Sequence, residues 1–304
     1  MNILVSGISG YVGSLVAARL ARNGDSVRGL ARHPERVQTS LPVLAGDAVS
    51  GAGLERALDG VEVAYFLIHS MEPADADPFA IRERTAAERF ATAARRAGVR
   101  RLIYLGGLVP EDTPASDHLA SRLEVERILL QGSPGSVALR ASIVIGARSR
   151  SFRFLVHLVE RLPVLALPGW RDNVTRPIDE RDIVEMLVRC ATSELVTGRS
   201  LDVGGPDVVS YGQLIGRIRE LMLVDRPTVR LGRLTVTPIA SRVAAVIAEE
   251  RHELIGPLME SLASDLLPRD DQAAQLLNIR LHSLNSAIEH SLREWEATEA
   301  LAAR

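Results

Sequence analysis

The sequence predicts an α/β fold: a doubly wound parallel sheet with helices on both faces and a smaller, mostly helical C-terminal cap. Short β-like runs alternate with helix-like runs through the first half of the chain, which is typical of successive βαβ units. Gly24, Gly60 and Gly98 each stand between a helix-like run and the next β-like run, where helices commonly end. The 304 residues are also enough to bury a large core.

The expected strands of the first half are short runs rich in aliphatic and β-branched residues, at residues 3–6, 26–31, 42–45, 63–68, 101–105 and 136–139. Helical spacing predicts the helices between them at residues 12–23, 53–58, 81–97 and 119–130. Right-handed crossovers place the carboxyl ends of all these strands at one edge of the sheet, and ligands of such sheets bind at that edge.

The second half is less regular. We expect a strand at 200–203, a helix at 211–223, a short strand at 228–231, mostly helix over 239–266 and a closing helix over 282–303. The turn Gly204-Gly205-Pro206 follows the first of these strands. The chain therefore divides into a sheet domain over residues 1–145 and a cap region over 146–304, with 200–206 returning to the sheet.

The composition argues against several classes of partner. The formal net charge is −2, and the 36 basic residues are all arginines spread along the chain, so no nucleic acid partner is expected. The sequence has no run of about 20 apolar residues to predict a transmembrane helix, and no metal-ligand spacing. Cys190 is the single cysteine and no signal peptide precedes the first expected strand, so we expect a cytoplasmic protein.

A glycine-rich turn follows the first expected strand and opens the first expected helix. Gly7 suits a tight turn, Gly10 lets the backbone approach a phosphate, and Gly13 allows the helix to pack closely on the strand. The turn directs backbone N–H groups and a helix N-terminus at one point, which suits a pyrophosphate. We therefore predict an NAD(P)-binding Rossmann domain over residues 1–145; a glycine-rich turn without a ligand is the alternative. The remaining residues expected to bind the cofactor in this turn are Ser9, Tyr11 and Val12.

The end of the second expected strand favours NADP(H) over NAD(H). An acid at this place would hold the ribose 2′-hydroxyl of NAD and repel the 2′-phosphate of NADP. Here the strand is followed by Arg32 and His33, and a guanidinium can hold a phosphate through two charge-assisted hydrogen bonds. The alternative is that Arg32 is a solvated loop residue.

Asp47 and Ala48 follow the third expected strand. The Asp47 carboxylate is placed to accept from an adenine amino group, while the next backbone N–H reaches the ring. An aspartate in this position is also a good cap for the following helix, and the two roles are compatible.

Together these segments resemble the short-chain dehydrogenase/reductase superfamily, in its atypical, NmrA-like branch. The resemblance covers nearly the whole chain and rests on the motifs VSGISGYVG (5–13), ARHPER (31–36), GD (46–47), AYFLIHSM (64–71), YLGGL (104–108), LRASIVIG (139–146) and DVGGP (202–206). It implies a bound nicotinamide cofactor, a small-molecule substrate or ligand, and a homodimer. The further cofactor contacts that it implies are Ile68, His69, Gly106 and Arg122.

The catalytic pattern departs from that of the superfamily. Catalysis there usually relies on a Tyr-x-x-x-Lys pair and a serine after the fifth strand. The best positional match here has His118 in place of the tyrosine and Arg122 in place of the lysine. Gly106 and Gly107 stand where the serine is expected. The superfamily mechanism therefore cannot be transferred intact.

Three hypotheses for the catalytic residues remain. His118 acts as the proton donor, for which an unperturbed pKa of about 6.5 is suitable. Alternatively, Arg122 keeps the ribose contact while His69 or Ser142 takes part in the chemistry. In the third, no chemistry occurs and the protein senses NADP(H), as the NmrA-like resemblance implies. A surface position for His118 and a backbone hydrogen bond for His69 are the structural alternatives.

Residues after the fifth and sixth expected strands are candidates for a substrate pocket. These are Gly107, Arg140, Ser142, Phe152 and Trp170, of which the two aromatic residues are equally well explained as core. The sequence thus favours an NADP(H)-dependent oxidoreductase acting on a small apolar carbonyl or alkene. A non-catalytic NADP(H) sensor or structural protein is the second hypothesis. A redox-neutral NAD-dependent epimerase or dehydratase is the third, and the missing acid after the second strand counts against it.

Overall fold

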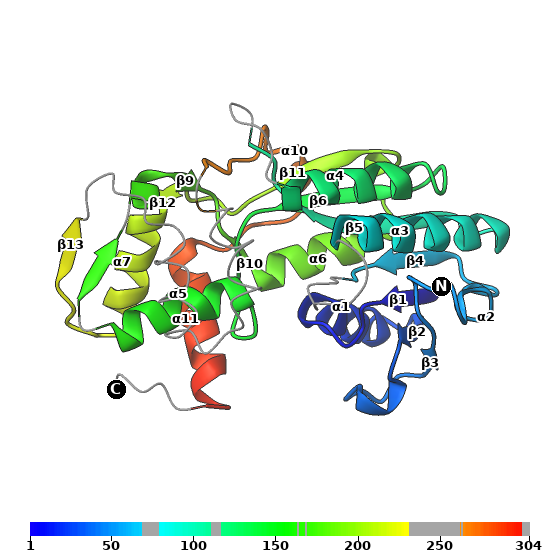
Figure 1. Cartoon of the computed structure of the whole chain (residues 1–304), viewed down its shortest axis with the longest axis horizontal. Coiled ribbons are helices and arrows are strands. Elements are labelled where there is room, and N and C mark those ends of the chain that lie inside the picture. The colour runs from blue at the N-terminus through cyan, green and yellow to red at the C-terminus, as the bar shows by residue number, and fades with distance from the viewer. Residues whose placement is uncertain are drawn as a thin grey trace.

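A computed structural model describes residues 1–68, 79–110, 117–162, 164–167, 169–230, 262 and 264–299. These residues form a large sheet lobe and a smaller lobe beside it (Figure 1). The N-terminus lies at the end of the sheet lobe remote from the smaller lobe, so the carboxyl ends of the strands face the smaller lobe.

A seven-stranded parallel sheet forms the centre of the large lobe, in the order β11-β6-β5-β4-β1-β2-β3. Its strands are β1 (Asn2–Ser6), β2 (Ser26–Ala31), β3 (Val43–Ala45), β4 (Val63–Phe66), β5 (Arg101–Gly107), β6 (Val137–Ala141) and β11 (Ser200–Val203). The chain order reverses on the two sides of β1 and β4, as in doubly wound sheets. The last strand comes from the second half of the chain and pairs with β6.

Helices cover both faces of this sheet. The helices are α1 (Tyr11–Arg22), α2 (Leu54–Leu58), α3 (Phe79–Arg96), α4 (Asp117–Leu130), α6 (Glu180–Cys190) and α10 (Gln272–Leu276), with the short η1 (Pro34–Arg36) and η3 (Glu194–Val196). In β1, Ile3 and Val5 pack with α1 and α6, whereas Leu4 packs with α2, α3 and α4 on the other face. This alternation explains why the strands are almost continuously apolar.

The smaller lobe has its own apolar core between three helices and short strand pairs. The helices are α5 (Arg150–Arg161), α7 (Tyr211–Leu221) and α11 (Leu284–Glu296), with the short η2 (Gly169–Asp172). The strand pairs are β7 (Val144–Ile145) with β10 (Ile178–Asp179), β8 (Leu165–Leu167) with β13 (Thr228–Arg230), and β9 (Val174–Thr175) with β12 (Val209–Ser210). In the part of the chain that the structure describes, no helix has the length and apolar character needed to cross a membrane.

The predicted α/β fold, its parallel sheet and its helical second lobe are confirmed, with most boundaries shifted by one to three residues. The third strand begins at Val43 and not at residue 42, because Pro42 has no N–H to donate to the ladder. The predicted closing helix over 282–303 is shorter, since α11 ends at Glu296. The helix predicted over 239–266 lies almost entirely outside the described residues.

Phe152 is a core residue of the smaller lobe and does not face an open pocket. Its side chain is completely buried on the inner side of α5, among apolar residues of α7 and α11. Trp170 is half-buried and packs against the same core, with its ring centroid 6.3 Å from that of Tyr211. The structure therefore places Phe152 in the core, whereas Trp170 packs on that core with part of its side chain exposed.

Replacing Phe152 with alanine should lower the free energy of unfolding by about 3–5 kcal/mol, because a fully buried aromatic side chain would leave a cavity. Urea denaturation would measure the change. Val208→Ala is the control, since Val208 is 57% exposed and its truncation should cost less than about 0.5 kcal/mol. A stable Phe152→Ala protein that has lost only ligand binding would contradict the core assignment.

Candidate cofactor site and active site

The glycine-rich turn joins β1 to α1 through very close backbone contacts. Gly7 has a φ of +79°, and a Cβ there would overlap the Leu67 carbonyl. A Cβ on Gly13 would overlap the carbonyl of Gly7. The N–H of Gly10 closes the turn by donating to the Gly7 carbonyl oxygen at 2.9 Å. Gly7 and Gly13 are therefore required by packing.

Gly10 leaves room for a ligand at the N-terminus of α1. A Cβ on Gly10 would meet the Gly7 oxygen at 3.1 Å, a tight but less severe contact. The first N–H groups of a helix have no partner within the helix, and together with the helix dipole they favour an anion. The first turn of α1 contains no acidic residue. This turn fits a pyrophosphate well.

Arg148 adds positive charge to the same helix end. Its guanidinium lies 5.7 Å from the centre of the Tyr11 ring and donates to the Ser14 hydroxyl at 2.5 Å. Sequence reasoning missed this residue, because nothing in the local pattern around residue 148 indicates that it reaches a turn far away in the chain.

Arg32 and His33 are exposed directly after β2. The imidazole Nδ1 of His33 lies 3.4 Å from the Glu35 carboxylate. The charge of Arg32 acts on Asp47, which follows the neighbouring strand β3. Arg32 and Asp47, which are predicted to contact the ribose phosphate and the adenine, are thus close enough to interact electrostatically.

The Asp47 carboxylate caps the turn that follows β3. It accepts hydrogen bonds from the N–H groups of Val49 at 3.0 Å and Ser50 at 3.2 Å. Burial tends to raise the pKa of Asp47, but these hydrogen bonds and the nearby Arg32 charge hold it below its ordinary value. The carboxylate therefore caps this turn and not the following helix α2, whose N-cap is Gly53 without a side-chain cap. The side chain of Ala48 is buried in the core, and Ile68 is half-buried beside it.

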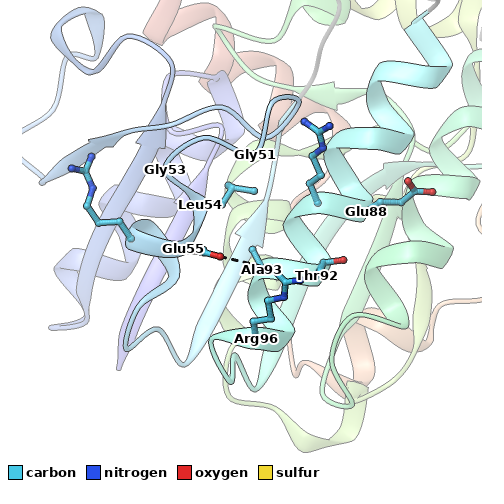
Figure 2. Close-up of a pocket in the computed structure, with 10 residues that line it drawn as sticks. Gly51, Gly53, Leu54, Glu55, Glu88, Thr92, Ala93 and Arg96 are labelled. Atoms are coloured by element: carbon cyan, nitrogen blue, oxygen red, sulfur yellow. Dashed lines mark ion pairs between the residues drawn. The ribbon is translucent and has the colours of Figure 1, made fainter.

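A groove of about 520 Å³ lies on the outer side of this region, between residues 51–56 and α3. Figure 2 shows Glu55 and Arg96 facing each other across it, and they form an ion pair at 3.8 Å. Glu88 and Thr92 line it from α3. Its lining residues differ from all those predicted to bind the cofactor, so the groove is separate from the glycine turn.

Arg122 belongs to a buried polar network below the end of β5. Its guanidinium is 5% exposed and donates to the Tyr104 hydroxyl at 3.0 Å. Ser121 donates to the Glu83 carboxylate at 3.0 Å in the same space between α3 and α4. Burial raises the pKa values of Glu83 and, to about 12, Tyr104, while the charge of Arg122 opposes both shifts. The guanidinium of Arg122 is thus engaged by the side chain of Tyr104 in this structure.

His118 is half-buried at the start of α4, with its ring centroid 5.4 Å from that of Phe79. Burial and the positive charge of Arg122 lower the pKa of His118 to about 4. The imidazole is therefore neutral at pH 7, and the environment opposes the protonated form that a proton donor with an ordinary pKa would use. Gly106 and Gly107, both half-buried, lie at the end of the adjacent strand.

Arg140 and Ser142 hold β6 to its neighbours. Arg140 donates to both oxygens of Glu126, at 2.7 and 2.6 Å, and lies 3.6 Å from Asp202. Ser142 donates to the carbonyl of Arg176 at 2.7 Å. Both residues thus have structural partners, and their predicted role in a substrate pocket stays a prediction. His69, the remaining catalytic candidate, lies outside the described residues.

The comparisons with known proteins support a nicotinamide cofactor. Residues 7–133 match a family described as NAD(P)H-binding. A reductase of (4-alkanoyl-5-oxo-2,5-dihydrofuran-3-yl)methyl phosphate from Streptomyces griseus is 32% identical over 228 residues, which cover 72% of this chain and 73% of that protein. The chain belongs to the atypical short-chain dehydrogenase/reductase superfamily of NAD(P)-binding proteins.

Longer proteins and solved structures share the same fold. An uncharacterised Mycobacterium tuberculosis protein is 25% identical over 261 residues, but these cover 86% of this chain and only 27% of that protein. A Thermotoga maritima UDP-glucose 4-epimerase with UDP-glucose has a TM-score of 0.75 at 16% identity, covering 98% of this chain and 99% of that one. A short-chain dehydrogenase/reductase from Agrobacterium tumefaciens with bound NAD has a TM-score of 0.70 at 19% identity, covering 98% and 96%.

Replacing Gly10 with alanine should weaken NADPH binding at least about tenfold, or about 1.4 kcal/mol, because the new methyl group occupies the approach of the phosphates. Fluorescence titration would measure the affinity. The unfolding free energy should change by less than about 1 kcal/mol.

Gly216→Ala on α7 is the matched control. A Cβ there meets no described atom within 4 Å, and alanine should stabilise the helix by about 0.5–1 kcal/mol without changing NADPH affinity. Unchanged affinity in the Gly10→Ala protein would show that the turn does not hold the phosphates.

Proposed function

We propose that this protein is an NADP(H)-dependent reductase acting on a small, mainly apolar carbonyl or conjugated alkene. Arg32 carries the cofactor preference: it is exposed directly after β2, where an acid would favour NAD(H). Its guanidinium can pair with a 2′-phosphate, and its positive charge is close enough to lower the pKa of Asp47, which follows the neighbouring strand β3.

Support for a reductase comes from the Streptomyces relative. The name of its substrate describes an alkanoyl-substituted dihydrofuranone, which combines carbonyl groups with a ring alkene and a phosphate ester. We extend the substrate class, but not that particular molecule, to this chain. The smaller lobe faces the same edge of the sheet (Figure 1), and we propose that it covers an apolar substrate.

Different residues of the chain bind the cofactor and orient the substrate. Backbone N–H groups from Gly10 onward hold the pyrophosphate, and Arg32 holds the 2′-phosphate. When bound, the nicotinamide supplies two electrons and one proton as a hydride. Neutral His118 offers a hydrogen bond that orients a substrate carbonyl. The proton that completes the reduction comes from water or from His69, which remains a proposed participant.

A non-catalytic NADP(H) sensor of the NmrA-like type is the second candidate. This candidate is favoured because Arg122 is hydrogen-bonded to the Tyr104 hydroxyl and because glycines stand at the usual serine position. Under this alternative the cofactor binds but no hydride is transferred. An NAD-dependent epimerase or dehydratase fits less well, because such enzymes retain NAD⁺ and the residue after β2 is basic.

Arg32→Glu should weaken NADPH binding at least about tenfold while changing NADH binding less than about threefold. Two charge-assisted hydrogen bonds are lost only with the phosphorylated cofactor, and hydrogen bonds to charged groups contribute about 1.5–3 kcal/mol each. Paired titrations with NADPH and NADH would measure the ratio.

Arg36→Glu is the control for the general electrostatic field. It makes the same charge change on η1, where the side chain is 77% exposed, and should affect both cofactors weakly. Equal losses of NADPH and NADH affinity in Arg32→Glu would overturn the NADP(H) preference.

Purified protein should oxidise NADPH when supplied with a conjugated enone or an alkanoyl-dihydrofuranone, followed by the loss of absorbance of the reduced nicotinamide. His118→Asn should lower kcat at least about tenfold and leave the NADPH dissociation constant unchanged, because the side chain orients substrate. Since the pKa of His118 is about 4, the rate should show no inflection from this residue between pH 6 and 8. Tight NADPH binding without turnover across the panel would favour the sensor.

A further inference from the structure

Glu180 connects the start of α6 to the glycine-rich turn. It is the first residue of α6, its side chain is 8% exposed, and its Oε2 accepts from the hydroxyl of Tyr11. Tyr11 is the first residue of α1, directly beside the N–H groups expected to hold the pyrophosphate. The two contacting residues are 169 positions apart in the sequence.

Gly146 makes room for this contact. A Cβ on residue 146 would overlap both the Tyr11 hydroxyl and the Glu180 carboxylate. Residue 146 follows β7, which pairs with β10 immediately before Glu180. The turn, the start of α6 and the chain after β7 therefore meet at one point.

Helix α11 of the smaller lobe closes the cluster. His290 Nε2 lies 3.9 Å from Glu180 Oε1 and 3.7 Å from Glu294 Oε1. One donor atom from each of these three side chains lies within 4.8 Å of the others. Burial raises the pKa of Glu180 to about 7, with Glu294 contributing to the rise and the Tyr11 hydrogen bond opposing it. At pH 7 the Glu180 carboxyl is therefore partly protonated, beside the carboxylate of Glu294.

We infer that Glu180 is a positioning residue for the cofactor: with Tyr11 and α11 it braces the phosphate-binding turn, and its protonation is coupled to binding of the anionic dinucleotide. This inference rests on the cofactor-binding role proposed above. It adds a link between the smaller lobe and the cofactor that the glycine motif does not contain.

The coupling follows from the charges around Glu180. While Glu180 holds a proton, Glu180 and Glu294 together carry one negative charge. Once Glu180 loses the proton they carry two, beside a helix end that must accept a pyrophosphate. The bound anion therefore favours the protonated pair, and by linkage protonation favours the bound anion. The affinity should be constant below the Glu180 pKa and fall as the pH rises above about 7.

The other ionisable groups around the pair do not reverse this sign. Arg148 faces Tyr11 from the chain before α5 and stays positive throughout. Asp179 of β10 is engaged with Arg181 at 2.5 Å. A proton on His290 would act in the same direction as a proton on Glu180. The hydroxyl of Tyr11 stays protonated, because burial and Glu180 raise its pKa well above the ordinary range.

The test measures dissociation constants for NADPH and NADH between pH 6 and 8.5 in wild type, Glu180→Gln and Glu185→Gln. Wild-type affinity should fall about three- to tenfold above pH 7, the upper value corresponding to a shift of one pKa unit on binding. Glu180→Gln keeps the shape and cannot lose a proton, so its affinity should stay at the low-pH wild-type value. Glu185→Gln on the same helix, which is 27% exposed and pairs with Arg19 and Arg189, should follow wild type.

Two further variants perturb the same cluster at other positions, so the test does not depend on one substitution that could disturb the fold. Glu294→Gln changes a half-exposed partner and should also flatten the pH profile. Gly146→Ala should weaken binding at all pH values, since it displaces the Tyr11–Glu180 contact. NADH serves beside NADPH because it has no 2′-phosphate to titrate.

A Glu180→Gln protein with the same pH dependence as wild type would overturn the inference. A gain in affinity on adding Zn²⁺ to wild type, absent in Glu180→Gln, would also overturn it, because the cluster would then hold a metal ion and not a proton. If the wild type binds neither NADPH nor NADH at any pH, the cofactor proposal itself fails and this inference with it.

Discussion

The close approach of α1 to the turn after β1 is the constraint on which the rest of the site depends. The Gly13 Cα lies so near the Gly7 carbonyl that no side chain fits between them. This packing fixes the N-terminus of α1 at the carboxyl edge of the sheet. The positive end of α1 and the exposed Arg32, which directly follows β2, then lie at this carboxyl edge, and the smaller lobe faces the same edge (Figure 1).

Buried charge explains why the residues proposed to bind the cofactor differ from those at the superfamily's catalytic positions. Arg122, at the position of the superfamily lysine, is buried and donates a hydrogen bond to the hydroxyl of Tyr104. Arg140 likewise pairs with the carboxylates of Glu126 on α4 and Asp202 on β11. A buried guanidinium is costly to unpair, so these side chains stabilise the lobe and are poorly placed to meet a ligand as well. The features proposed to bind the cofactor are instead backbone groups and exposed side chains.

The order of strands and helices in the sheet lobe could be predicted from sequence, because apolar periodicity and glycine positions are local signals. The short pairs β7–β10 and β9–β12 could not be predicted, since two-residue strands exist only through their partners. Helix α5 was not predicted either, and its Phe152 was considered for a pocket. The structure shows that the apolar side of α5 is required for the core of the smaller lobe.

The sequence by itself determined the doubly wound fold, the glycine turn and the basic residue after β2, because each depends on backbone geometry or on one residue type at one position. Only the tertiary structure decided how the polar side chains are used. His118 is neutral at pH 7 because of its burial and the neighbouring Arg122. Glu180 meets Tyr11 because α6 packs beside α1 on one face of the sheet. Side-chain pKa values and contacts depend on residues distant in the chain, which no local pattern contains.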